Sequence, residues 1–204
     1  VHSVTVVPNT SELKCTCGDL GCSNPGKHPS VPRGFKEATT DLEKITKWWG
    51  DAGTHSDHNI GLVPGLSGLV VIDIDPKNGG DHSLDKMIDT YGPMGFDTAP
   101  RVRTGSGGNH FYFQADSQIS NSRGALPQGI DVRGCSGYVV AAPSFHISGK
   151  PYVWENVHDL SELMANVKPL DPEFLNLIKA KRCTSSAKPN TTQENADSKL
   201  TESK

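Results

Sequence analysis

Two aspartates at the end of an apolar run have the spacing of a metal-binding pair. The segment Gly68-Leu-Val-Val-Ile-Asp73-Ile-Asp75-Pro76 has the β-branched pattern of a buried central strand. Because side chains alternate along a strand, the two aspartates point to one side, with Cα atoms roughly 6–7 Å apart. Such carboxylates repel each other unless a proton or a cation lies between them. Mg²⁺ or Mn²⁺ fits this role; the alternative is a solvated strand end with one aspartate capping the turn at Pro76.

A glycine-rich turn could bind phosphate. In Thr104-Gly-Ser-Gly-Gly-Asn-His110, the backbone N–H groups of Ser106, Gly107 and Gly108 are unobstructed, which suits phosphate oxygens. The turn is neither a Walker A loop nor a dinucleotide fingerprint, and an ordinary hairpin turn is the alternative. The imidazole of His110 could donate to a phosphate, bind a metal or cap the following strand.

A third carboxylate completes the set. In Gly129-Ile-Asp131-Val-Arg133-Gly134, Asp131 and Arg133 lie on one face of a short strand, where they could also simply pair with each other. Three carboxylates beside a phosphate-binding turn describe a two-metal phosphoryl- or nucleotidyl-transfer site. Metal charge and His110 would there neutralise the charge of the transition state.

A second metal is expected in the loop that precedes these segments. Cys15, Cys17, Cys22 and His28 lie within a stretch rich in Gly, Ser and Asn, and their number and type predict a closed Cys₃His zinc site. Four protein ligands leave no open position, so the Zn²⁺ would be structural. Free thiols, or cysteine ligands with a fourth partner from elsewhere, are the alternatives.

Composition excludes several classes of protein. The chain has 204 residues and a net charge of −3, so it lacks the basic footprint of a histone-like binder. The longest run without a charged residue, Gly134–Gly149, is too short and too broken to span a bilayer. An odd number of cysteines, five, with no secretion signal predicts a reducing, cytoplasmic location and no disulfide framework.

The remaining elements must position these groups. Residues 60–63 and 68–75 are predicted to pair as an antiparallel hairpin. A capping box at Thr40–Glu43 predicts a helix ending at Gly50, with Leu42, Ile45 and one of the two following tryptophans in the core. Asp81 is predicted to cap a second helix that closes at Gly92. We expect a catalytic domain over 1–182, with the zinc loop at about 15–29, and a disordered linker or tail over 183–204.

The sequence resembles the bifunctional DNA primase/polymerases (prim-pols) of the archaeo-eukaryotic primase superfamily, the type found in phage and plasmid replication. The resemblance covers about residues 15–155. It is carried by Gly-Lys-His-Pro at 26–29, Gly34–Asp41, Trp48-Trp49, Asn59-Ile60-Gly61, Gly68–Asp75, Thr104–Phe113 and Ile130–Ser144. The family's Pro-Pro-Ser is Ala142-Pro143-Ser144 here.

The resemblance implies a fold and a site. The fold is α/β (α+β): a primase-like catalytic core with an RRM-like mixed or antiparallel sheet, a second αβ half and a zinc loop. Asp73, Asp75 and Asp131 would hold the catalytic Mg²⁺ or Mn²⁺. His110 and the turn at Ser106–Gly108 would bind the phosphates of the incoming nucleotide, and Arg133 would contact the nucleotide.

The activity implied is that of a template-dependent DNA primase or DNA polymerase, a nucleotidyltransferase. Its partners would be single-stranded DNA template, primer and (d)NTPs, in the bacterial cytoplasm if the chain is phage-encoded. Family members commonly precede a helicase, and related proteins often need an additional helical domain to prime. The alternatives are a catalytically inactive nucleotide- or DNA-binding module and a metal-dependent nucleotide phosphohydrolase.

Overall fold

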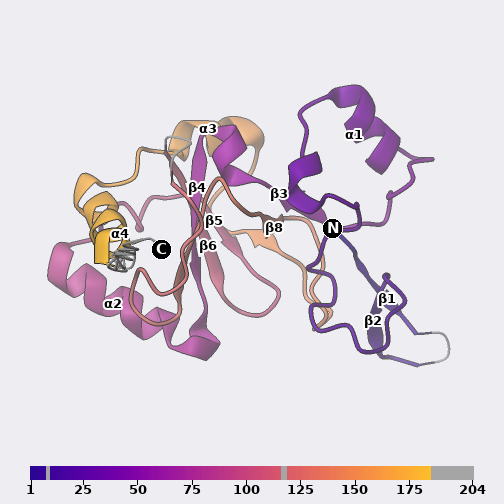
Figure 1. Cartoon of the computed structure of the whole chain (residues 1–204), viewed down its shortest axis with the longest axis horizontal. Coiled ribbons are helices and arrows are strands. Elements are labelled where there is room, and N and C mark those ends of the chain that lie inside the picture. The colour runs from indigo at the N-terminus through magenta and orange to yellow at the C-terminus, as the bar shows by residue number, and fades with distance from the viewer. Residues whose placement is uncertain (8–9, 116–118, 185–204) are drawn as a thin grey trace, which may run out of the picture.

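The fold is mixed α/β and is built around one antiparallel sheet (Figure 1). The computed structural model describes residues 1–7, 10–115 and 119–184. Strands of the main sheet run in the order β7-β4-β6-β5-β9. Their bounds are β4 Leu69–Ile74, β5 Arg101–Arg103, β6 Asn109–Gln114, β7 Ile130–Arg133 and β9 Val153–Trp154. Two-stranded sheets pair β1 (Val4–Val6) with β2 (Leu13–Cys15) and β3 (Ile60–Leu62) with β8 (Val139–Ala141).

The helices lie on both sides of this sheet. They are α1 Leu42–Trp49, α2 Gly80–Tyr91, α3 Leu160–Asn166 and α4 Pro172–Thr184. Short 3₁₀ turns cover Gly34–Glu37 (η1), Pro64–Ser67 (η2) and Pro76–Asn78 (η3). Figure 1 shows α2 and α4 on one side of the sheet, and α1 with the β1–β2 pair on the other. Because β6 lies between the parallel strands β4 and β5, the segment β4-α2-β5 forms a split β-α-β unit.

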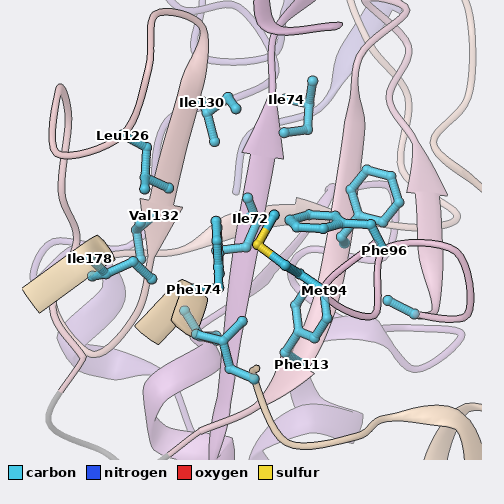
Figure 2. Close-up of a cluster of buried hydrophobic side chains, with 14 of the residues drawn as sticks. Ile72, Ile74, Met94, Phe96, Phe113, Leu126, Ile130, Val132, Phe174 and Ile178 are labelled. Atoms are coloured by element: carbon cyan, nitrogen blue, oxygen red, sulfur yellow. The ribbon is translucent and has the colours of Figure 1, made fainter. Parts of the chain in front are cut away.

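One face of the sheet is a hydrocarbon core. Val70, Ile72 and Ile74 are fully buried on β4 and pack toward α2 and α4. Phe96 meets Phe174 of α4 edge-to-face, with ring centroids 5.3 Å apart (Figure 2). Since side chains alternate along β4, this packing forces Asp73 to the opposite face.

The predicted hairpin between residues 60–63 and 68–75 is wrong. Strand β3 pairs with β8 in the register Ile60↔Ala141, while β4 pairs with β6 and β7. The connection folds as η2 and ends at Gly68, whose φ is +67°; this is not a two-residue hairpin turn. Hydrophobic pattern identified both strands, but their partners come from distant parts of the chain.

Two helix predictions also need correction. The N-cap of α1 is Asp41 rather than Thr40, and its carboxylate accepts from the N–H groups of Glu43 and Lys44. No residue of α1 is buried and Leu42 is 76% exposed, so the predicted core position of Leu42 is wrong. Helix α2 begins at Gly80 with Gly79 as its N-cap, not at Asp81.

The predicted boundary between the catalytic domain, 1–182, and the tail, 183–204, stays a prediction. Helix α4 runs through Thr184, and the rest of the predicted tail lies outside the described residues. In the part of the chain that the structure describes, no helix is both long and apolar enough to cross a membrane. The sheets and helices agree with the predicted α/β class, whereas the archaeo-eukaryotic primase fold itself is an expectation that the resemblance supplies.

Candidate active site

Three predicted site residues form one row across the main sheet. In the strand register, Asp73 of β4 lies directly opposite His110 of β6 on one side and Asp131 of β7 on the other. Directly opposed residues in antiparallel strands have Cβ atoms about 4.5–5.5 Å apart. Two carboxylates at that spacing repel each other, so the row needs a cation.

Arg133 supplies positive charge to this row. Its Nη2 donates to Asp73 Oδ2 at 3.0 Å and to Asp131 Oδ2 at 2.9 Å. All three side chains are partly buried. Burial raises the pKa of Asp131; Arg133 opposes that shift, and the neighbouring Asp73 adds to it. The predicted Asp131–Arg133 pair is therefore present, and it extends to Asp73.

His110 closes the other end of the row. It is only 5% exposed, and its Nε2 lies 3.6 Å from Asp73 Oδ1. Burial lowers the pKa of His110, and the opposing influence of Asp73 is smaller. Its Nδ1 is buried without a hydrogen-bond partner among the described residues. Burial therefore favours the neutral imidazole, in which one ring nitrogen donates and the other accepts.

Asp75 lies just beyond the strand and performs a local task. It is the N-cap of η3, where Oδ1 accepts from the N–H of Lys77 at 3.0 Å and Oδ2 from Asn78 Nδ2 at 2.7 Å. Its backbone N–H donates to Gly129 O at 2.8 Å, which ties it to the start of β7. The capping alternative is thus present. A carboxylate oxygen can accept further bonds, so capping does not exclude a metal.

The glycine-rich turn joins β5 to β6 and is organised by Thr104. The N–H of Gly107 donates to Thr104 O, and the N–H of Gly108 donates to Thr104 Oγ1 at 2.9 Å. These two amides are therefore already used within the turn. Ser106 Oγ lies 3.0 Å from Thr104 Oγ1 and faces the cavity described next, so it is the better placed phosphate contact of the predicted three.

A cavity of about 990 Å³ opens over the row. Its size is at the upper end of the range for ligand sites, about 300–1,000 Å³. Eight of the predicted site residues line it: His28, Asp73, Asp75, Ser106, Gly108, His110, Asp131 and Arg133. Gly107 does not line it. Segments far apart in the sequence thus meet at one site.

The oxygen donors of this cavity suit Mg²⁺ or Mn²⁺, which prefer carboxylate oxygens with open positions for water and phosphate. The carboxylates do not form a closed ligand set. Residues 1–7, 10–115 and 119–184 contain one group of three or more metal-ligating side chains whose ligand atoms all lie within 4.8 Å of one another. That group lies outside the carboxylate row. Arg133 bonds two of the three carboxylates, Asp73 and Asp131, and so takes the place that a metal cation would take between them.

That closed group is the predicted Cys₃His set of Cys15, Cys17, Cys22 and His28. Cys15 Sγ lies 3.2 Å from His28 Nε2 and accepts from the N–H of Gly26 at 3.4 Å. Burial opposes ionisation of Cys15, but hydrogen bonds, that of Gly26 foremost, outweigh it and lower its pKa to about 7. Thiolate and imidazole donors in this number are compatible with zinc.

Sequence reasoning missed several residues of the site. Lys27, Tyr138 and Tyr152 also line the cavity. Burial lowers the pKa of Lys27, and Asp73 opposes that shift. Only Lys27 had a signal in the sequence, as the neighbour of a zinc ligand. Tyr138 and Tyr152 directly precede the short strands β8 and β9, and the apolar pattern of those segments does not show which residue faces a cavity.

Comparison with known families gives one match. The family described as bifunctional DNA primase/polymerase, N-terminal, matches residues 3–172. This range includes the zinc loop, the turn and all three carboxylates. No curated protein matches the sequence significantly.

Proposed function

The chain belongs to the bifunctional DNA primase/polymerase family, and on that premise we propose that it is a template-dependent nucleotidyl transferase of phage or plasmid DNA replication. It would use (d)NTPs to make or extend primers on single-stranded DNA, with a helicase region as partner. The observation that carries the proposal is the row Asp131–Asp73–His110, which faces a cavity large enough for a nucleotide.

In the proposed reaction, the oxygen of a 3′-hydroxyl forms a bond to the α-phosphorus of the bound nucleotide. The bond from that phosphorus to the oxygen that bridges to the β-phosphate breaks, pyrophosphate leaves, and the hydroxyl proton passes to water. Mg²⁺ or Mn²⁺ held by Asp73, Asp75 and Asp131 would supply charge that acidifies the hydroxyl and stabilises the leaving group.

The protein's own side chains would orient the nucleotide. Burial favours the neutral form of His110, and the residue lines the cavity beside Asp73, which supports a hydrogen bond from its imidazole to a phosphate oxygen. Ser106 would contact the phosphates from the turn. Arg133 would neutralise Asp73 and Asp131 until cations bind, and its guanidinium would then be available to the nucleotide.

We also propose a structural Zn²⁺ on Cys15, Cys17, Cys22 and His28. Metal analysis of the purified, folded protein tests this: we expect one zinc per chain. A folded sample with much less than one zinc per chain would contradict the site.

Primer synthesis and primer extension on a single-stranded template test the activity. The assay should compare dNTPs with NTPs and Mg²⁺ with Mn²⁺. We expect extension by the wild-type chain and none by Asp73→Ala. Nucleotide binding without extension under any of these conditions would favour the inactive binding module.

Pyrophosphate release separates the remaining alternative. A template-dependent primase or polymerase releases pyrophosphate only when template is present. Release of phosphate or pyrophosphate at the same rate without template would favour a metal-dependent phosphohydrolase.

A further inference from the structure

Lys27 lies where the zinc loop meets the candidate active site. It is half-buried and lines the cavity together with Asp73 and Asp75. Among the described residues, no carboxylate lies within 4.0 Å of its ammonium group. Arg133, by contrast, is held by two carboxylates. Lys27 is thus a cation directed at the cavity that no ion pair neutralises.

The backbone around Lys27 is fixed from three directions. The carbonyl groups of residues 26, 27 and 28 accept, in that order, from Asn59 Nδ2 at 2.9 Å, Tyr138 Oη at 2.6 Å and the N–H of His2 at 2.9 Å. Asn59 is itself buried, 3% exposed. Three successive carbonyls held by separate segments leave this stretch little freedom.

The zinc ligands hold the same stretch from inside the loop. Gly26 donates its N–H to Cys15 Sγ, and His28 belongs to the Cys₃His group. Gly26 has a φ of +70°, and a Cβ atom there would lie 2.9 Å from Val4 Cγ1. Both neighbours of Lys27 are therefore attached to the Cys₃His group.

We propose that Lys27 binds the polyphosphate of the incoming nucleotide and that the zinc group, through residues 26–28, is the device that positions it. This rests on the proposed function, since it names a phosphate contact of that same site. An ammonium is a compact point charge that suits phosphate oxygens. The carboxylates would hold the nucleotide's metal ions, and Lys27 would neutralise phosphate oxygens that those ions leave.

Direct nucleotide binding by the full chain tests the lysine. Binding of a fluorescent deoxynucleoside triphosphate, diphosphate and monophosphate should be measured for wild type, Lys27→Met and Lys14→Met. Lys14 is a matched control, because it also directly precedes a zinc ligand, Cys15, but is exposed on β2 and away from the cavity.

We expect Lys27→Met to weaken triphosphate binding roughly 10- to 100-fold, as a lost charged hydrogen bond does, with the monophosphate affected far less. Lys27→Arg should restore part of the affinity, and Lys14→Met should bind like wild type. Unchanged triphosphate binding by Lys27→Met, or an equal loss for all three nucleotides, would overturn the proposal.

Two further variants test the positioning. Cys17→Ser should lose zinc and weaken triphosphate binding, and adding Lys27→Met to it should have little further effect. Fully additive effects in the double variant would overturn the role of zinc. Should Cys17→Ser not fold, Tyr138→Phe leaves the four Cys₃His side chains intact and removes the hydroxyl that bonds Lys27 O. It should retain one zinc and bind triphosphate several-fold more weakly; wild-type affinity would count against the positioning.

The two proposals can fail separately. Binding is measured without template or primer, and extension is measured with both. A wild-type chain that binds triphosphate through Lys27 but never extends a primer would contradict the proposed polymerase activity and support the role of Lys27. Primer extension by Lys27→Met with an unchanged KM for dNTP would support the polymerase activity and contradict the role of Lys27.

Discussion

The carboxylate row and the zinc loop reach the same cavity by different physical means. Asp73, His110 and Asp131 are placed by the hydrogen-bond ladder of three adjacent strands, with a hydrocarbon core behind them. In the zinc loop, residues 15–29, only Cys15 and Gly26 are buried. That loop brings four candidate metal ligands together and is held by side chains that bond its carbonyls.

In the carboxylate row, side chains can be changed without changing the fold, whereas in the zinc loop the same side chains support both fold and function. A row carried by a strand ladder keeps its backbone when one side chain is removed. A loop without a core loses its conformation when its metal ligands or the side chains that bond its carbonyls are removed. We therefore expect variants in the row to lose activity but stay folded, and variants in the loop to change structure and nucleotide binding together.

The largest effect is expected at the centre of the row. Asp73→Ala should reduce primer extension roughly 1,000-fold or more, because it removes a proposed ligand of the catalytic cations and leaves Arg133 paired with Asp131 alone. Its thermal unfolding should stay close to that of wild type. Asp89→Ala, an exposed aspartate on α2, is the matched control and should extend primers normally. Unfolding of Asp73→Ala would contradict the separation of fold and function.

The core behind the row should show the reverse pattern. Phe174 is fully buried on α4, so Phe174→Ala should lower the free energy of unfolding by about 3–5 kcal/mol. Denaturant titration measures this, and Phe174→Leu should cost less because it leaves a smaller cavity. The molecules that remain folded should still bind one zinc. A loss below about 1 kcal/mol would mean that α4 is not part of the core.

A smaller loss of stability is expected at Asn59, one of the side chains that bond the carbonyls of the zinc loop. Asn59 bonds Gly26 O at 2.9 Å and both backbone groups of Phe145, so Asn59→Ala leaves three backbone groups without partners. We expect a stability loss of about 2–3 kcal/mol, with faster amide exchange in residues 15–29 than in β4 and β6. Asn24→Ala, at an exposed position of the same loop, should change stability by less than about 0.5 kcal/mol. Equal acceleration of exchange in sheet and loop would remove the contrast between them.

The smallest effect is expected on α1. Leu42 is 76% exposed, so Leu42→Ser should change the free energy of unfolding by no more than about 0.5 kcal/mol and leave extension unchanged. A loss of several kcal/mol would show that this helix face is covered, as the sequence pattern predicts.

The sequence by itself determined the local elements and most of the candidate site. The continuous, mostly β-branched apolar run that begins at Leu69 predicted β4, and the two aspartates at its end were expected on one side because side chains on a strand alternate faces. Likewise, four ligands of suitable chemistry within one short loop predicted the Cys₃His group, which the structure brings together. Signals of this kind depend only on residues that are close in the chain.

Only the tertiary structure decided which elements meet. Strand β3 pairs with β8 rather than with β4, and no local pattern contains that choice, because hydrophobic periodicity marks a strand without naming its partner. The same holds for Arg133 of β7, whose contact with Asp73 depends on the register between β7 and β4. It also holds for Lys27, which lies at the cavity in a stretch whose carbonyls are bonded by Asn59, Tyr138 and His2. Long-range register and packing fix these positions, so they come from the folded chain rather than from its local sequence.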